Sequence, residues 1–466
     1  PVASNAQDTT SAIRGRVLDP NGAPVAGASI IVEDTRSGVA RSLTTSDDGL
    51  FLATRLLPGG PYRVTVGGTD SAVVPSIDVG DTYNFTMNLV AGETIDEIVT
   101  VGKATDIVDV ASGPAATFSL ADLENTVAFS RDIADVYGID PRLNIDIDED
   151  GVGINCGGKH PRFNSTTLDG VSVGDRFGLN ENGYATAVGM PFPYDGIEQV
   201  AVELAPFDVT YGGFSACIIN SVTRAGTNEW EGKAFYEYSN NDMRGDTIKN
   251  DPNDYGRDSY DKWNMGFNIG GPIIKDTLFF HASYEKSEVP RFLAKGYAGS
   301  GNGEERPWLS QEDYERIDSI ARGFDYDTGG QPGDGLQENE KYLLRVDWNI
   351  NDNHNAAAIY GYFDGYQLRD SDGDDNEFEF ANHYYTKGAE FESMTFKVTS
   401  QWTDNFSTEL FYNNSTMDDS QITVGDKDFP DIQITVEEAD GTRNTVYLGA
   451  DDSRQANSLD TCLLYT

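Results

Sequence analysis

Short runs in which apolar and polar residues alternate follow one another over residues 13–90. Segments rich in Gly, Pro, Asn and Asp separate these runs at intervals of roughly 8 to 12 residues, a spacing that is typical of a small β-sandwich. The runs are IRGRVLD, ASIIVED, VARSLTT, GLFLAT, YRVTVGG and YNFTMNLV. The pattern therefore predicts a sandwich over residues 11–90, preceded by a short linker at residues 1–10.

Longer alternating runs begin after Asn228 and cover residues 229–238, 262–270, 278–286, 342–350, 356–366, 389–402 and 406–414. Tight turns and long polar loops alternate between them, which is the sidedness of an outer-membrane β-barrel. The 23 Tyr and 23 Phe of the chain would supply the aromatic girdles that such a barrel needs. We therefore predict about seven strands of a partial transmembrane antiparallel β-barrel over residues 229–461.

Both ends of the chain depart from these patterns. The last residues, 462–466, do not continue the alternation, and we interpret them as an anomalous tail from a truncated or frame-shifted reading frame. A plugged transporter closes with about 22 strands, so more strands are expected than these runs supply. Ser4 and Ala6 form a small-x-small pattern, which we interpret as the remnant of a signal-peptide cleavage site within residues 1–10; a random polar N-terminus is the alternative.

Residues 105–228 lie between the two β regions and carry short β-branched runs among many turn residues, with a helix-start signal at Ser119. This composition is typical of a compact α+β domain, and its place before the long strands suggests a plug. Three segments, FNSTTLDGVSVGDRFGLN, DGIEQVAVELAPFDVTYGGF and INSVTRAGTNEWEGKAF, resemble the plug of TonB-dependent outer-membrane receptors of the Oar-like subgroup. GRVLDPNGAPVAGASIIV resembles the carboxypeptidase-regulatory-like, transthyretin-like domain that this subgroup carries in front of the plug.

The resemblance extends from about residue 11 to about residue 460. It implies a mostly β fold: a transthyretin-like N-terminal β-sandwich, an α+β plug and the first strands of a transmembrane antiparallel β-barrel. It also implies a protein of the outer membrane, with a periplasmic N-terminal domain, that takes up an unidentified ligand with the help of a TonB-type energy-transducing protein. The expected partners are that protein, outer-membrane lipid and the extracellular ligand.

Other functions remain open at this point. A surface-exposed structural, adhesion or export-related outer-membrane protein is the main alternative, and a polysaccharide importer of the SusC-like kind is a variant of the first interpretation. A soluble carbohydrate-binding β-protein is disfavoured by the alternating aromatic strands. The four histidines are widely spaced and no catalytic motif is present, so we expect no enzymatic activity.

The linker at residues 91–104 contains a segment that resembles a TonB box. Its residues are Asp96, Glu97, Ile98, Val99, Thr100 and Val101. A polar start, a β-branched middle and flanking glycines suit a segment that is added as a strand to the edge of a partner's sheet. The alternative is an ordinary strand that leads into the plug.

Two cysteines, Cys156 and Cys217, lie in the predicted plug beside small residues. Because the periplasm and the cell surface are oxidising, we predict a disulfide between them rather than two free buried thiols. Cys462 lies in the predicted tail and receives no role.

The chain is strongly acidic, with 77 Asp and Glu against 33 Lys and Arg and a formal charge of −44. This balance excludes nucleic acid as a partner, because phosphate binding needs clustered basic residues. Two acidic runs, one at Asp146, Asp148 and Asp150 and one at residues 370–375, are similar to calcium loops but lack the ligand pattern of a complete one. Calcium is thus the one candidate ion, solvated acidic loops are the alternative, and we assign no metal site and no cofactor.

Charged residues are also scattered through the predicted plug. We interpret them as partners for the inner wall of the barrel that hold the plug in place, with plain surface charge as the alternative. They are Arg162, Asp169, Asp175, Arg176, Asp195, Glu198, Glu203, Asp208 and Arg224.

Overall fold

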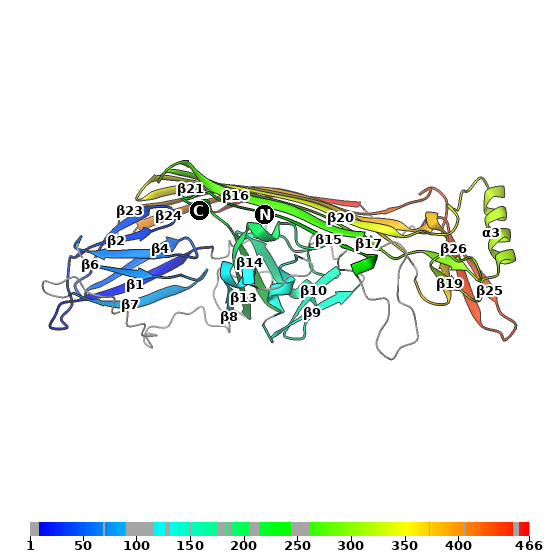
Figure 1. Cartoon of the computed structure of the whole chain (residues 1–466), viewed down its shortest axis with the longest axis horizontal. Coiled ribbons are helices and arrows are strands. Elements are labelled where there is room, and N and C mark those ends of the chain that lie inside the picture. The colour runs from blue at the N-terminus through cyan, green and yellow to red at the C-terminus, as the bar shows by residue number, and fades with distance from the viewer. Residues whose placement is uncertain are drawn as a thin grey trace.

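The computed structural model describes residues 9–68, 70–89, 115–125, 131–138, 140–148, 151–175, 180, 182–184, 186, 188–204, 214–243, 261–371, 373–403 and 406–450, together with the backbone of 456–465. The fold is mostly β, and it confirms the predicted order of an N-terminal sandwich, an α+β plug and antiparallel barrel strands. In Figure 1 the N-terminal domain lies at one end of a long sheet, the plug lies beneath the middle of that sheet, and α3 lies at the opposite end.

The N-terminal domain, residues 9–89, is a sandwich of two sheets with the strand orders β4-β1-β7 and β3-β2-β5-β6. The strands are β1 (Ser11–Leu18), β2 (Ser29–Asp34), β3 (Val39–Thr44), β4 (Leu50–Leu56), β5 (Tyr62–Val66), β6 (Asp70–Val74) and β7 (Thr82–Asn88). Ile13 and Val17 of β1 face Ile30 and Val32 of β2 in the core, and each is at most 1% exposed. They stand at alternate positions, as the period of a strand requires. The alternation pattern had not predicted β6.

The plug comprises the described residues from 115 to 223 and is built on a sheet with the order β12-β11-β14-β13-β8. Its strands are β8 (Ala115–Phe118), β9 (Leu143–Asp148), β10 (Gly151–Cys156), β11 (Ser165–Leu168), β12 (Val171–Ser172), β13 (Ile197–Leu204) and β14 (Cys217–Thr223). Its helices are α1 (Leu120–Asn125), α2 (Ala134–Tyr137), η1 (Pro161–Phe163) and η2 (Tyr194–Gly196). Every residue of β14 is buried, because this strand is paired on both sides in the middle of the sheet.

The wall sheet is formed by eight antiparallel strands of the described chain, each paired with its neighbour in sequence order. They are β15 (Glu231–Asn240), β16 (Asp261–Ile274), β17 (Leu278–Arg291), β20 (Gly335–Asn351), β21 (His354–Arg369), β23 (Tyr385–Thr403), β24 (Phe406–Thr423) and β27 (Ala456–Tyr465). The first seven correspond to the predicted runs. In the eighth, β27, the backbone of residues 462–465, part of the predicted tail, pairs regularly with β24.

The two faces of the wall sheet differ in chemistry, as expected for a membrane barrel. Side chains on the outer face include a row of aromatic rings that crosses four neighbouring strands. The row runs in the order Phe267, Tyr284, Tyr342 and Tyr362, and the centroids of successive rings are 5.7, 5.1 and 5.7 Å apart. Near the short turns, Trp348 and Trp402 are exposed on the same face by 50% and 57%. Aromatic rings on the outer face are typical of a surface that faces lipid.

The cap is the name we give to the long connections at the other end of the wall sheet. The connections that follow β17, β21 and β24 pack around one core that contains Leu309, Ile317, Phe378, Phe380 and Val446. The elements of the cap are η3 (Asn241–Met243), β18 (Lys295–Tyr297), β19 (Glu304–Arg306), α3 (Gln311–Gly323), β22 (Glu377–Glu379), η4 (Ala381–His383), β25 (Ile432–Glu437) and β26 (Arg443–Leu448). Helix α3 begins after Ser310, whose hydroxyl accepts the Asp313 N–H as an N-cap.

No helix among the described residues is both long and apolar enough to cross a membrane.

Gly226 lies where the chain passes from the plug to the wall sheet, and a Cβ at this position would meet the backbone of Phe280, with its nitrogen at 2.7 Å. Backbone atoms cannot move aside as a flexible side chain can, so we expect Gly226→Ala to lower the free energy of unfolding by roughly 1 to 3 kcal/mol. Urea unfolding of the lipid-reconstituted chain measures this change. Gly333→Ala is the matched control, because open space surrounds that position. An equal loss in both variants would contradict the close approach at Gly226.

Candidate functional site

The plug rests on the inner face of the wall sheet through one continuous apolar core. This core joins Phe192 and Val200 of the plug to Leu343, Ile359 and Phe363 of β20 and β21. The three wall residues stand at inward-facing positions of their strands, where every second residue meets the plug. Because hydrophobic contact is not directional, the orientation of the plug depends on the polar contacts around this core.

Arg131 forms the first of these polar contacts. Its Nη2 lies 2.7 Å from Oδ2 of Asp195 in the plug, and its Nε lies 3.6 Å from Oε2 of Glu285 on β17. The guanidinium also stacks on Phe235 of β15, 3.6 Å from the ring centroid. Glu285 is 2% exposed and is further contacted by Lys341 at 3.9 Å. A buried carboxylate of the wall is therefore neutralised from the plug and from a neighbouring strand.

Arg345 of β20 forms the second contact. Its Nη1 donates to the carbonyl and to the hydroxyl of Thr223, both at 3.0 Å, and lies 3.9 Å from Asp169. Asp169 accepts the backbone N–H and the hydroxyl of the same threonine at 3.2 and 2.6 Å. The other side of the guanidinium is held by Asp347 at 2.9 Å. The end of β14 is thus fixed to the wall by a network in which each charge has an opposite partner.

A third contact joins Asn180 of the plug to Asp419 of β24, with 3.0 Å between Nδ2 and Oδ2. Together with the Arg131–Glu285 and Asp169–Arg345 pairs, it forms what we call the plug seat. The seat spans strands that lie far apart in the wall, from β17 to β24. Rotation of the plug would break contacts on several strands at once.

The predicted plug charges divide among several positions. Asp169 and Asp195 belong to the seat, and Arg224 pairs with Glu231 of β15 at 2.7 Å. Arg162 is exposed, and Asp175 accepts the N–H of Asn180. Arg176 and Asp208 lie outside the described residues. Glu203 lies on β13 and is partly buried.

Glu198 pairs with the N-terminal domain and not with the wall. Arg36 donates to Glu198 at 3.0 Å and to Asp34 at 2.9 Å. Burial disfavours the cation, but the nearby Asp34 and Glu198 carboxylates outweigh this effect and raise the pKa of Arg36. Beside this pair, Gln199 accepts the Val79 N–H at 2.9 Å and donates to the Ile77 carbonyl at 3.3 Å. These contacts, which we call the N-terminal junction, dock the sandwich on β13.

Cys156 at the end of β10 and Cys217 at the start of β14 are joined in a disulfide, with 6.0 Å between their Cα atoms. Both residues are buried in the plug core. The bond links the β9–β10 hairpin to the central strand of the plug sheet. The six residues of the predicted TonB box, from Asp96 to Val101, lie outside the described residues.

The two acidic runs that resemble calcium loops lie in different parts of the fold. Asp146 lies in the β9–β10 hairpin, opposite Gly153. Asp370 binds Nζ of Lys295 at 2.7 Å, and this cation outweighs the effect of burial and lowers the pKa of Asp370. In the described part of the chain, no three His, Cys, Asp or Glu side chains are grouped as ligands for a metal ion.

Sequence reasoning missed Arg131, Glu285 and Arg345, although these residues carry most of the seat. Glu285 and Arg345 do show one signal, because they occupy inward-facing positions in strands whose other face is apolar and aromatic. A charge at such a position needs a partner from the plug. The sequence does not tell which plug residue supplies it.

We expect Arg131→Met to destabilise the plug by about 3 kcal/mol, because Glu285 would lose its partner from the plug while still buried. The measurement is urea-dependent proteolysis of the plug in the lipid-reconstituted chain. Adding Glu285→Gln to Arg131→Met should restore part of the loss, since it removes a buried charge that would keep Lys341 as its only ionic partner among the described residues. Arg162→Met is the matched control, as that plug arginine is exposed. Equal losses in the two single variants would contradict a seat at Arg131.

For the disulfide we expect one reactive thiol in the denatured, unreduced chain and three after reduction, since the chain has three cysteines. Reduction should destabilise the plug by roughly 4 kcal/mol, as the chain-entropy model gives for a closed loop of 61 residues. Cys462→Ser serves as the control, leaving no reactive thiol before reduction. Three reactive thiols without reductant would contradict the bond.

Comparisons with known proteins agree with this architecture. The carboxypeptidase regulatory-like domain family matches residues 12–90, and the outer membrane beta barrel domain family matches residues 222–291. The TonB-dependent transporter Oar of Myxococcus xanthus is 26% identical over 150 residues, which are 30% of this chain and 13% of that protein.

One solved structure supports the same fold, and a second is similar to a smaller degree. The outer membrane transporter YddB from Escherichia coli is similar with a TM-score of 0.50 and 12% identity, over 76% of this chain and 46% of that one. The siderophore receptor PirA from Acinetobacter baumannii has a TM-score of 0.48 and 15% identity, over 75% of this chain and 44% of that one. The chain therefore spans less than half the length of these relatives. In its domain order and its fold, the chain is thus similar to TonB-dependent outer-membrane transporters such as Oar, with a carboxypeptidase regulatory-like domain in front of the plug.

Proposed function

We propose that the protein is an outer-membrane transporter that takes up an extracellular ligand by TonB-driven movement of its plug, with no covalent chemistry. The observation that carries the proposal is the plug seat. Its contacts are charged or polar pairs between two separate bodies, and such pairs can be solvated again when the plug moves. The Myxococcus relative is a TonB-dependent transporter, which supports the same function.

The proposed entry point for force is the segment Asp96 to Val101, between β7 and β8. Strand β8 lies at the edge of the plug sheet and pairs only with β13 among the described strands. A pull on the chain before Ala115 therefore loads the β8–β13 pair before any other pair of the plug. Edge strands have a single ladder to lose, so this pair opens at a lower cost than the pairs between the central strands of the plug sheet.

The disulfide limits how far such an opening extends. It ties β10 to β14, the strand on the other side of β13 from β8. The β9–β10 hairpin therefore stays attached to the centre of the plug when β8 leaves. We infer that the movement is confined to the β8 side and to the seat contacts on the wall.

The ligand would bind between the cap and the plug surface below it. The cap has its own core and buried ion pairs, such as Lys295 with Asp370 at 2.7 Å, so it offers a fixed surface rather than separate loops. Phe324 at the end of α3 is 73% exposed. The chemical class of the ligand stays open.

We expect Ile98→Pro to abolish binding of the periplasmic domain of a TonB-type protein to the lipid-reconstituted chain, whereas Ile98→Val should keep it. Proline cannot donate to a strand ladder and would interrupt the added strand, and valine keeps the β-branched shape. Surface plasmon resonance measures both variants against the unaltered chain. Equal binding by all three proteins would overturn the assignment of the box.

A cellular experiment separates the proposed transport from adhesion. Deletion of Asp96 to Val101 from the complete gene should end energy-dependent uptake and leave the amount of protein in the outer membrane unchanged. A protein that only adheres would keep its activity after the deletion, and that result would contradict transport.

A further inference from the structure

The cap contains a small sheet with the strand order β22-β26-β25, and its two edges differ. Side chains cover the β22 edge. Nε of Arg306 donates to the Glu377 carbonyl at 2.7 Å, and Nε1 of Trp308 donates to a second carbonyl, that of Asp375, at 2.9 Å. At the other edge lies β25, which pairs with β26 alone among the described strands. Figure 1 places β25 at the end of the wall sheet that lies opposite the N-terminal domain.

The outer edge of β25 presents backbone groups that no other residue of the described chain binds. The Glu438 N–H donates to the Thr442 carbonyl at 2.9 Å, and this bond fixes which pairs are hydrogen-bonded along the hairpin. Bonded and non-bonded pairs alternate in an antiparallel ladder. The N–H and C=O groups that point away from β26 are therefore those of Gln433, Thr435 and Glu437. These groups can pair with one further strand.

The same strand carries apolar side chains that a further strand would cover. Ile432, Ile434 and Val436 alternate with exposed residues and pack, only partly buried, against the cap core. Edge strands are commonly protected by proline, lysine or a β-bulge. The sequence IQITVE contains neither proline nor lysine, and its pairing with β26 shows no shift in register. An added strand with apolar residues at every second position would bury the three side chains further.

The surroundings of β25 are acidic. Between residues 426 and 443 the chain carries six carboxylates and two cations, Lys427 and Arg443. The carboxylates belong to exposed residues, which are Asp426, Asp428, Asp431, Glu437, Glu438 and Asp440. A second copy of the chain would bring the same carboxylates against each other, and like charges on paired strands are destabilising. A strand with basic side chains between its apolar residues would instead meet opposite charge.

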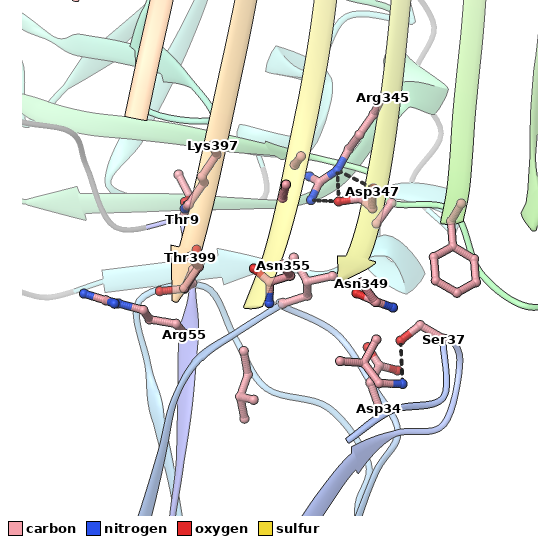
Figure 2. Close-up of a pocket in the computed structure, with 18 of the residues that line it drawn as sticks. Thr9, Asp34, Ser37, Arg55, Arg345, Asp347, Asn349, Asn355, Lys397 and Thr399 are labelled. Atoms are coloured by element: carbon pink, nitrogen blue, oxygen red, sulfur yellow. Dashed lines mark hydrogen bonds and ion pairs between the residues drawn. The ribbon is translucent and has the colours of Figure 1, made fainter. Parts of the chain in front are cut away.

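The opposite end of the wall sheet is already covered by the chain itself. Figure 2 shows Lys397 of β23 beside Thr9 of the N-terminal domain, and Nζ of this lysine donates to the threonine hydroxyl at 2.5 Å. A cavity of about 90 Å³ lies between the N-terminal domain and the ends of the wall strands. Asp347, which lines this cavity, is already paired with Arg345 at 2.9 Å. A partner therefore finds open backbone groups at the cap end, along β25.

We propose that β25 binds an extended, basic peptide segment of a partner outside the cell, and that this segment joins the cap sheet as an antiparallel strand. Its apolar side chains lie beside Ile434 on the cap core, and its lysine or arginine side chains lie beside Glu437 on the exposed face. Main-chain hydrogen bonds give such a complex its affinity, and alternate side chains give it specificity. Binding at β25 needs no movement of the plug, so the inference is independent of TonB-driven uptake.

The test measures binding of a fluorescent peptide, Val-Lys-Val-Lys-Val-Lys-Val, to the full chain in lipid nanodiscs by fluorescence anisotropy, with empty nanodiscs as the background. In the proposed pairing the lysine N–H groups face β25 and the valine N–H groups face away. Methylation of the three lysine backbone nitrogens should therefore abolish binding. Methylation of three valine backbone nitrogens should leave it unchanged, although the two methylated peptides have the same charge and composition.

Thr435→Pro is the matching change in the chain. It removes the central N–H that points away from β26, and proline is tolerated at such a position of an edge strand. We expect the Kd of the peptide to rise at least about tenfold, because one main-chain hydrogen bond is lost and its acceptor is left unpaired. Thr435→Val is the matched control, since it keeps the N–H and the β-branched shape. Unchanged exchange of the Val446 amide, opposite Ile434, shows that the proline variant keeps the hairpin; if it does not, the methylated peptides alone decide.

Binding that is lost with the lysine-methylated peptide and weakened in Thr435→Pro, and that persists with the valine-methylated peptide and in Thr435→Val, supports the site. Equal binding of the two methylated peptides overturns it, since attraction between charges alone would then hold the peptide. The absence of binding by the unmethylated peptide also overturns it. A concentration-dependent dimer of the unaltered chain that Thr435→Pro abolishes would show that a second copy occupies β25, and it would overturn the peptide site as well.

Discussion

A charge on the inner face of a barrel strand must be paired once a plug covers it, and this constraint governs the interior of the protein. Strand geometry directs every second residue inward. Glu285 of β17 and Arg345 of β20 therefore point to a surface that is buried beneath the plug. An unpaired buried charge costs several kcal/mol. Arg131 and Asp169 of the plug supply the opposite charges, and the position of the plug follows from where these partners stand.

The same constraint explains how a plug can be both well placed and removable. A buried ion pair contributes little net stability compared with apolar packing, because the attraction mainly offsets the loss of hydration. It is nevertheless specific, since removing one partner is costly while solvating both together is not. The apolar core shared with Leu343 and Ile359 supplies adhesion, and the charged pairs supply position. Water that enters as the plug shifts can stabilise both halves of each pair.

Much of the fold was predictable because its signals are local. The alternation of polar and apolar residues located seven wall strands and the sandwich. Predictions failed where distant packing decides. In α3, Ile317 is buried and Ile320 is 53% exposed, because the cap core reaches only one side of the helix. Strand β27 was not predicted, because the β25–β26 hairpin separates it in the sequence from β24, the strand with which it pairs.

The site was less predictable than the fold for a related reason. Asp195 could be named as a plug charge, but its partner Arg131 stands 64 residues away, and Glu285 lies a further 90 residues along the chain from Asp195. Only the folded chain brings the three together. For Glu198 the predicted partner was wrong: we expected a residue of the wall, and Glu198 pairs with Arg36 of the N-terminal domain.

The N-terminal junction and the edge strand of the plug meet on one strand, and this arrangement determines where force on the linker acts. Gln199 of β13 holds the N-terminal domain, and the next residue, Val200, pairs with Phe118 of β8. The linker leaves the N-terminal domain after β7 and enters the plug at β8. Tension on the linker therefore acts on β13 from both ends of the linker: through the N-terminal sandwich at one end and through β8 at the other. A partner that pulls the linker must separate one of these two contacts first, and whatever strengthens the docking of the sandwich directs the opening toward β8.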